Sequence, residues 1–210
     1  MTAARAHPLP TAKSRQRREE LLTAAQRVFA EHGYFDTRIA DVVAVAEVAH
    51  GTFYTYFSSK DDVLRALVGR MSDDLFELTS HPVERSDTPF LMLEATIRQF
   101  MHAYRDWAGL LRILDQAVAF SDEFLVLRQQ IRDRFGERIE RAIRAHQGRQ
   151  GRQRRQGRQA ALDPALAAYA LGGMVEDFAR GCYTLGHPVE EEQAVSTLAV
   201  IWARAVGLDF

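Results

Sequence analysis

TRIADVVAVAEVAHGTFYTYFSSK, residues 37–60, is the stretch around which we expect the rest of the chain to be organised. Ile39, Val42 and Val43 recur at helical spacing, which predicts a short helix with one apolar face. Thr37 is a suitable N-cap for this helix, because its hydroxyl can accept a hydrogen bond from a free N–H of the first turn.

A second short helix is expected from about His50 to Phe57, after a brief break around residues 47–49. It would bury Phe53 and Phe57, which are four positions apart and therefore share one helix face. The other face carries polar side chains, namely His50, Thr52, Thr55 and Tyr56. Two short helices joined by a tight turn, the second with a polar outer face, form a helix-turn-helix unit that reads DNA.

The side chains of the second helix suit DNA better than they suit a generic surface. Gly51 has no side chain, so its backbone can come close to a phosphate. The hydroxyls of Thr52, Thr55, Tyr54 and Tyr56 can bond phosphate oxygens or base edges. Lys60 stands at the start of the next helix, where its charge and the free backbone N–H groups can both meet a phosphate.

At these residues the sequence resembles the tetracycline-repressor (TetR) family of transcription regulators. The resemblance covers about residues 21–67, and its most specific part is GTFYTYFSSK at positions 51–60. Phe29, Gly33 and Tyr34 stand at the matching distance upstream. This combination is much more specific than a helix-turn-helix pattern alone.

Two positions depart from the family's usual pattern. Glu47 stands where the family usually has a turn glycine, so we expect Glu47 to adopt a left-handed or bent conformation at some local cost. Ala49 stands where the family usually has a capping Ser or Thr. The second helix therefore lacks a side-chain cap that is worth about 1 kcal/mol.

The composition allows DNA binding only through local charge, because 27 basic and 28 acidic side chains nearly cancel. Residues 1–60 carry eight basic and six acidic side chains, which is a weak electrostatic signal. The single cysteine, Cys182, excludes an internal disulfide and indicates a reducing compartment. No run approaches the ~20 apolar residues of a membrane span, and the start does not read as a signal peptide. We expect a cytoplasmic protein with no membrane partner.

We expect an all-α protein of about nine helices in two domains. Residues 1–12 would form a flexible arm, which either reaches into a minor groove or is an idle tail. Residues 13–60 would form a three-helix DNA-binding domain, whose first helix ends at Gly33. Residues 61–210 would form a larger helical bundle for ligand binding and dimerisation.

Six helices are expected in the larger part, each with its own apolar stripe. Their approximate ranges are residues 60–79, 88–104, 107–120, 122–146, 163–185 and 190–206. Arg and Glu would cover the outer face of the 122–146 helix. Residues 147–160, beginning QGRQGRQRRQGRQ, would form a mobile Arg/Gln/Gly loop that is either solvated or an accessory nucleic-acid contact.

Aromatic and methionine side chains in the central helices are the only sequence hint of a ligand. They would either wall an apolar cavity or fill an ordinary core. The candidates are Phe90, Phe100, Met101, Tyr104, Trp107, Phe120, Met174 and Phe178. The resemblance implies a small-molecule effector without saying which one.

The last two helices are expected to serve dimerisation, because the resemblance implies that they pair with their two-fold mates. Operators with two half-sites require such a dimer. The candidate interface residues are Leu171, Val175, Val195, Leu198 and Trp202. The alternative is that these side chains close the core of a single chain.

The sequence shows no catalytic, metal or cofactor signature: it has no HExxH pair, no CxxC and no glycine-rich phosphate loop. Cys182 lies on an apolar helical face, where a buried inert thiol is a better interpretation than a nucleophile. We therefore expect no enzyme activity, no cofactor and no metal.

These observations predict a homodimeric repressor that a small apolar ligand releases from a palindromic operator. The ligand would shift the helix at residues 60–79 and change the spacing of the two reading heads from roughly 34–36 Å. Base contacts are expected from His50, Thr52 and Thr55, and phosphate contacts from Thr37, Arg38, Gly51, Tyr54, Tyr56 and Lys60. The alternatives are a ligand-independent activator or architectural DNA binder, and an all-helical carrier or enzyme that does not bind DNA.

Overall fold

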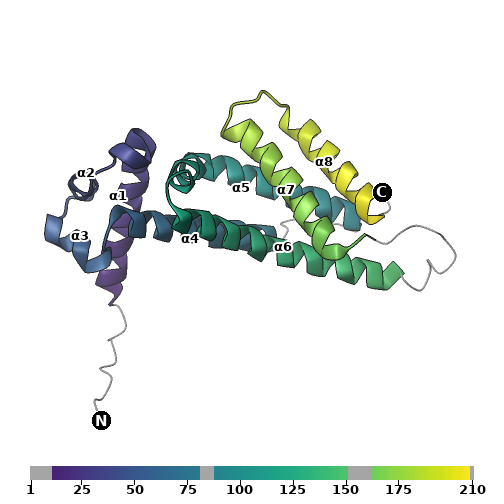
Figure 1. The fold of residues 1–210 in the computed structure, drawn as a ribbon, viewed down its shortest axis with the longest axis horizontal. Coiled ribbons are helices and arrows are strands. Elements are labelled where there is room, and N and C mark those ends of the chain that lie inside the picture. Colours follow the sequence, from purple (N-terminus) through teal and green to yellow (C-terminus); the bar gives the residue numbers. More distant parts are fainter. Residues whose placement is uncertain (1–10, 81–87, 151–161, 209–210) are drawn as a thin grey trace, which may run out of the picture. The chain divides into compact units, whose positions relative to one another are not determined.

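The computed structural model describes residues 11–80, 88–150 and 162–208, and within these ranges the chain forms eight α-helices and no strand (Figure 1). The chain divides into two compact units, residues 1–69 and 70–210, and helix α4 begins in the first and ends in the second. The helices are α1 (Ala12–Asp36), α2 (Ile39–Val45), α3 (His50–Tyr56), α4 (Lys60–Ser80), α5 (Pro89–Val118), α6 (Asp122–Gln150), α7 (Pro164–Tyr183) and α8 (Glu191–Val206). The expectation of an all-α fold is confirmed.

The first unit is organised around buried apolar side chains from all four of its helices. In α1 these side chains form the expected stripe, Leu21, Leu22, Ala25, Val28 and Phe29. The others are Val42 and Val43 of α2, Phe53 of α3, and Val63, Leu64, Leu67 and Val68 of α4, with Phe57 between α3 and α4. Burial of this apolar surface is the main stabilising term for so small a unit.

Gly33 interrupts α1, as expected, because its φ of 75° and ψ of 179° lie outside the helical region. The prediction that Thr37 caps α2 is wrong. The N-cap of α2 is Arg38, whose backbone N–H donates to the Asp41 carboxylate over 3.2 Å. Thr37 is 2% exposed and donates its hydroxyl hydrogen back to the Gly33 carbonyl over 2.6 Å, so it holds the end of α1 instead.

The turn between α2 and α3 has the two features expected from its unusual residues. Glu47 has a φ of 52°, which is the left-handed conformation that L-residues rarely adopt. Ala49 is the N-cap of α3 and provides no side-chain hydrogen bond. Both expectations are confirmed, so this turn carries strain that a glycine and a capping hydroxyl would remove.

The second unit contains one long helix where two were expected. Helix α5 runs without a break from Pro89 to Val118, with Thr88 as its N-cap. The expected break between Tyr104 and Trp107 is absent because the two intervening residues are exposed and the buried stripe continues past them to Ala108 and Leu110. For this reason the described ranges contain eight helices instead of about nine.

Two other expected boundaries move or fall outside the described ranges. Helix α6 continues to Gln150, four residues into the segment predicted as a loop, and the remainder of that segment to residue 160 lies outside the described residues. Most of the expected arm, residues 1–10, also lies outside them. Helix α1 begins at Ala12, because the Thr11 hydroxyl accepts a hydrogen bond from the Ser14 N–H over 3.2 Å.

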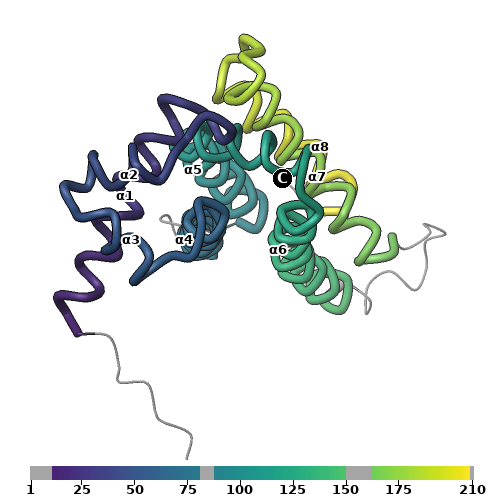
Figure 2. The backbone as a smooth tube through the Cα atoms, turned by 60° about the vertical axis from the view of Figure 1, so that its left-hand side comes forward, coloured from purple at the N-terminus to yellow at the C-terminus, as the bar shows by residue number. Residues whose placement is uncertain are grey.

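Helix α7 packs on α6 and α5, and α8 packs on α5 (Figure 2). Four of the five candidate dimer residues, Leu171, Val175, Val195 and Leu198, are buried in the two apolar clusters that these contacts form. The fifth, Trp202, packs against both clusters. These side chains therefore close the core of one chain, which was the alternative interpretation. Among the described residues, no helix has the length and apolar character needed to cross a bilayer.

Replacing Glu47 by glycine should stabilise the protein. A left-handed conformation costs an L-residue about 1–2 kcal/mol, and the freedom of glycine in the unfolded chain offsets about 0.4–1 kcal/mol, so we expect the free energy of unfolding to rise by roughly 0.5–1 kcal/mol. Urea denaturation followed by circular dichroism measures this change. Glu31→Gly is the matched control, because Glu31 is exposed inside α1 and its replacement should lower the same quantity by about 0.5–1 kcal/mol. Equal losses in both variants would contradict the assignment of strain to Glu47.

Candidate functional site

Helix α3 presents a polar face to solvent and an apolar face to the core of its unit. Phe53 is fully buried and Phe57 is 3% exposed. On the other side Tyr54 is 53% exposed. His50, Gly51 and Thr55 are also exposed, and Thr52 and Tyr56 are half-buried. Six of the predicted DNA-contacting residues thus lie on one short helix, and the five that have polar side chains are exposed or half-buried.

Contacts within α3 order part of this face. The rings of His50 and Tyr54 lie one helical turn apart with their centroids separated by 5.4 Å. The Thr55 hydroxyl donates to the Gly51 carbonyl over 3.4 Å, a long bond that a ligand acceptor can replace. Arg38 is exposed at the start of α2, which leaves its guanidinium accessible to a phosphate.

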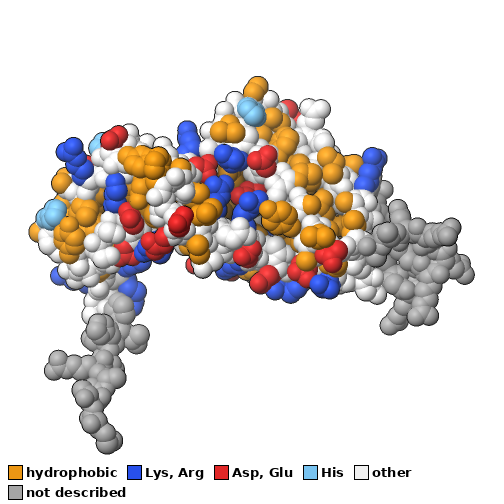
Figure 3. Space-filling view, viewed as in Figure 1, with side chains coloured by type: hydrophobic (Ala, Val, Ile, Leu, Met, Phe, Trp, Pro, Cys, Tyr) orange, Lys and Arg blue, Asp and Glu red, His pale blue; other side chains and the backbone are white. Residues whose placement is uncertain are grey.

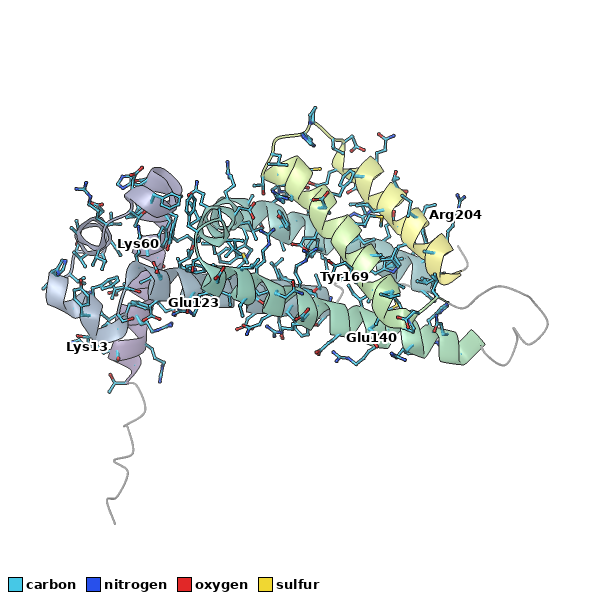
Figure 4. The ribbon with its side chains drawn as sticks, viewed as in Figure 1. Lys13, Lys60, Glu123, Glu140, Tyr169 and Arg204 are labelled. Atoms are coloured by element: carbon cyan, nitrogen blue, oxygen red, sulfur yellow. The ribbon has the colours of Figure 1, made fainter. Side chains whose placement is uncertain are left out.

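Lys60 has a different role from the predicted phosphate contact. Its Nζ donates to the carbonyls of Tyr34, Phe35 and Thr37 over 2.8, 3.0 and 3.4 Å. Nζ also lies 4.8 Å from the centroid of the Tyr34 ring. An ammonium has three N–H donors, and these carbonyls use all three. Lys60, labelled in Figure 4, therefore ties the start of α4 to the segment after the break in α1.

Tyr34 strengthens the same connection from the other side. Its hydroxyl donates to the Asp61 carboxylate over 2.9 Å, and its ring is buried against Phe29. The predicted set is thus divided by the structure. His50, Gly51, Thr52, Tyr54, Thr55, Tyr56 and Arg38 lie at the surface, whereas the side chains of Thr37 and Lys60 serve the interior of the unit.

Charge on the surface does not mark the site. Figure 3 shows Lys and Arg side chains interspersed with Asp and Glu on the face in view, without a single basic patch. Several basic side chains near the start of α1 are engaged locally, since Arg17 pairs with Glu20 at 2.7 Å and Arg18 lies over the Phe57 ring. Hydroxyl groups and backbone N–H groups are therefore the main polar groups that α3 offers to a duplex.

The second unit contains a cavity of about 930 Å³ lined by α4, α5, α6, α7 and the end of α8. Two of the eight predicted ligand-binding residues, Phe100 and Tyr104, line it. The other six lie elsewhere. Met101 is fully buried in a core cluster, against which Phe90, Met174 and Phe178 pack. Trp107 lies beneath the Arg70 guanidinium, and Phe120 is 75% exposed after the end of α5.

Charged side chains of α6 also line the cavity, although they were expected on the outer face of that helix. Arg128 pairs with Asp115 at 2.5 Å, and Arg132 pairs with Glu176 at 3.0 Å. Arg138 bonds to residues of α4. Sequence reasoning missed these arginines because it assigned every charge on an amphipathic helix to solvent. The signal that could have found them was their position beside the apolar stripe of Ile131, Phe135 and Ile139.

Two titratable groups of this unit are unsuited to chemistry near neutral pH. Burial raises the pKa of Tyr104 to about 12. Burial also raises the pKa of the Cys182 thiol, with a further contribution from Glu191, so the thiolate is disfavoured. Within the described ranges no group of three His, Cys, Asp or Glu side chains is placed to hold a metal ion.

Comparison with known proteins agrees with this geometry. Residues 21–67 contain α2, α3, most of α1 and the start of α4, and they match the family described as bacterial regulatory proteins, tetR family. Over these residues the chain belongs to the TetR family. This is a family of regulatory proteins and not of enzymes, and the resemblance seen in the sequence is confirmed.

Curated relatives match only part of this chain. The regulator HbdR of Aromatoleum is 35% identical over 77 residues, which cover 33% of this chain and 34% of HbdR. The repressor KstR of Mycobacterium tuberculosis is 29% identical over 108 residues, covering 51% of this chain and 49% of KstR. The chain thus matches about a third to a half of the length of these curated relatives.

Solved structures share the fold over nearly the whole chain. A putative TetR-family regulator from Syntrophomonas wolfei has a TM-score of 0.72 at 24% identity, covering 93% of this chain and 97% of its own. The regulator FadR from Bacillus subtilis, solved in complex with stearoyl-CoA, has a TM-score of 0.71 at 17% identity, covering 89% and 98%. At these identities the likeness establishes a common fold and nothing more.

Lys60→Met should destabilise the first unit, because it leaves three carbonyls without their shared donor. Hydrogen bonds to a charged group contribute about 1.5–3 kcal/mol, and we expect a loss of that size in the free energy of unfolding. Urea denaturation measures it. Lys13→Met, at an exposed position in α1, should change the same quantity by less than about 0.5 kcal/mol. If Lys60→Met were as neutral as Lys13→Met, the structural role of Lys60 would be refuted.

Proposed function

We propose that this protein is a homodimeric, sequence-specific DNA-binding repressor, and that a small apolar ligand in the cavity of the second unit releases it from a palindromic operator. The observation that carries this proposal is the polar outer face of α3 above the buried Phe53 and Phe57, in a domain of the TetR family. Such a face on the second helix of a helix-turn-helix is what enters a major groove.

In this proposal α3 reads the bases and its surroundings hold the backbone. His50, Thr52 and Thr55 contact base edges, and Gly51, Tyr54, Tyr56 and Arg38 contact phosphates. Thr37 and Lys60 act indirectly, because their hydrogen bonds hold the segment between the break in α1 and the start of α2. The phosphate-binding surface therefore depends on interior contacts of the unit.

The cavity supports regulation by a ligand. Its volume of about 930 Å³ lies near the upper end of the 300–1,000 Å³ that is typical of ligand pockets. Met71, Leu75 and Thr79 of α4 line it, and α4 begins at Lys60 in the DNA-binding unit. A ligand that displaces α4 would change the affinity for operator, and the operator would change the affinity for ligand by the same factor. The cavity favours this function over a ligand-independent DNA binder.

Exposed apolar side chains on α7 and α8 support dimerisation. Leu166 is 72% exposed, and Ile201 is 46% exposed. Figure 3 shows hydrophobic side chains gathered over the region of these helices. A contiguous exposed apolar surface of this kind commonly marks a protein interface. In our proposal it packs on the same surface of a second copy, which places two α3 helices on the two half-sites of one operator.

Selection of bound duplexes from a random pool should yield a palindrome, and substitutions in α3 should then separate base contacts from phosphate contacts. His50→Ala and Thr52→Ala should each lower affinity for the selected duplex by about ten- to a hundredfold and relax the preference at one base pair. Arg38→Ala should weaken binding to all duplexes and reduce the salt slope by about 1. Fluorescence anisotropy at several salt concentrations measures both effects. Unchanged affinity in all three variants would contradict the proposed interface.

Ile201→Glu should convert the dimer into a monomer, because it places a charge in the centre of the proposed apolar interface. Sedimentation equilibrium measures the molecular mass in solution. Leu91→Glu is the matched control, since Leu91 is also 46% exposed but lies on α5. A monomeric wild-type protein, or a dimer that survives Ile201→Glu and dissociates with Leu91→Glu, would contradict this interface.

A further inference from the structure

Arg138 of α6 lines the cavity and carries a positive charge that only neutral groups contact. Its Nη1 donates to the Phe76 carbonyl over 3.1 Å and to the Ser80 hydroxyl over 2.8 Å. Its Nη2 donates to the Thr79 hydroxyl over 2.8 Å, and the guanidinium lies over the Phe76 ring. Among the described residues, no carboxylate lies within 4.0 Å of this guanidinium and its Nε–H has no acceptor.

Most of the other charged groups around the cavity have partners of opposite sign, whereas Asp133 accepts a hydrogen bond from the Gln129 amide over 2.8 Å. Arg128 and Arg132 are paired with Asp115 and Glu176. The acidic lining residues Glu137 and Glu140 are paired with Arg141 and Arg144, which lie one turn further along α6. Arg149, also in the lining, is exposed near the end of α6. Arg138 thus combines partial burial with the absence of a counter-charge.

A partly buried cation without a counter-ion is energetically unfavourable and attracts an anion. Burial lowers the pKa of Arg138, and repulsion by Arg141 and Arg134 adds to this effect, yet arginine stays protonated. The free Nε–H belongs to the edge of the guanidinium that binds carboxylates in a bidentate manner. Arg98 shows this geometry elsewhere in the protein, with Nε and Nη2 on the two oxygens of Glu192 at 3.1 and 2.9 Å.

The rest of the cavity is largely apolar, and its lining extends along α6. Its lining on α6 extends from Arg128 to Arg149, which corresponds to about 30 Å at 1.5 Å per residue. On the same basis Arg138 lies about 15 Å from the Arg128 end of this lining and about 16 Å from the Arg149 end. The walls include Ile97, Phe100 and Ile131. An apolar lining that extends along one helix suits a ligand with an aliphatic chain.

We propose that Arg138 binds the anionic head group of a long-chain aliphatic ligand, either the carboxylate of a fatty acid or a phosphate of its coenzyme A thioester. The apolar chain lies along α6 in the cavity. This inference rests on the proposed function, because it names the chemical class of the effector and the residue that recognises it.

The same residue gives the ligand a direct effect on α4. The Thr79 and Ser80 hydroxyls donate to the Leu75 and Phe76 carbonyls and accept from Arg138, so Arg138 holds the last turn of α4. The final carbonyls of a helix need such partners. An anion bound to Arg138 competes for its donors and loosens this turn, and α4 continues to Lys60 in the DNA-binding unit.

Displacement of a fluorescent fatty acid, 11-(dansylamino)undecanoic acid, from the full-length protein tests the head-group requirement. Palmitate or palmitoyl-CoA should displace the probe at concentrations at least tenfold below those of the neutral 1-hexadecanol. If only palmitate displaces the probe, the group that Arg138 binds is the carboxylate. If only palmitoyl-CoA displaces the probe, that group is a phosphate. Displacement by 1-hexadecanol at the same concentration would overturn the proposal without any variant.

Substitution of Arg138 tests the residue itself. Arg138→Gln should weaken probe binding at least tenfold and remove the preference for anionic competitors, while Arg138→Lys should keep part of that preference because it keeps the charge. Arg112→Gln, at an exposed position on α5 outside the cavity lining, is the matched control and should bind as the wild type does. Circular dichroism and thermal melting establish that each variant is folded. If Arg138→Gln does not fold, Arg138→Lys becomes the test of the residue. If Arg138→Lys binds the probe with wild-type affinity and keeps the full preference for anionic competitors, a bidentate contact is contradicted.

A parallel measurement separates failure of this inference from failure of the proposed function. The ligand-free wild-type protein is titrated with the selected duplex. No DNA binding would refute the proposed function, and the probe measurements would still stand. If the protein binds DNA, and a neutral aliphatic compound releases the DNA as well as palmitate or palmitoyl-CoA does, the proposed function is supported. The role of Arg138 is then overturned.

Discussion

Two cationic side chains, Lys60 and Arg138, each fix one end of helix α4 by hydrogen bonds. The rest of the structure depends on these contacts. At the start of α4, the ammonium of Lys60 donates to three carbonyls between the break in α1 and the start of α2. At its end, the guanidinium of Arg138 donates to the last turn. Because α4 is one continuous helix, a change at its end has a covalent and hydrogen-bonded path to the DNA-binding unit. Charge at these two places binds carbonyl and hydroxyl groups of the protein itself.

In the first unit, the turn that positions α3 is locally unfavourable. Glu47 adopts a left-handed conformation, and Ala49 provides no side-chain cap, so the turn is more strained than a family-typical turn would be. The burial of Phe53 and Phe57 offsets this cost and determines which face of α3 is outside. Since the residues on that face carry hydroxyl and imidazole groups, binding would depend more on hydrogen-bond geometry than on a strong electrostatic field.

In the second unit, charged and apolar side chains are divided between a core, a cavity and the exposed surface. Helix α7 uses one face to bury Leu171 and Val175 and leaves Leu166 exposed, and α8 likewise buries Leu198 and leaves Ile201 exposed. Helix α6 combines an apolar stripe with arginines that border the cavity. A single amphipathic helix can serve two partners in this way because its side chains point in several directions around the axis.

The sequence by itself determined the helical fold, the helix-turn-helix with its outward polar face, the break at Gly33 and the strained turn at Glu47, because these follow from periodicity and backbone preferences over a few residues. Only the tertiary structure decided the roles of Thr37, Lys60 and Arg138, the continuity of α5, and which apolar residues line the cavity. The physical reason is that a long side chain such as Lys60 or Arg138 reaches partners remote in the sequence, and an apolar stripe does not state whether a neighbouring helix, a cavity or a second chain covers it.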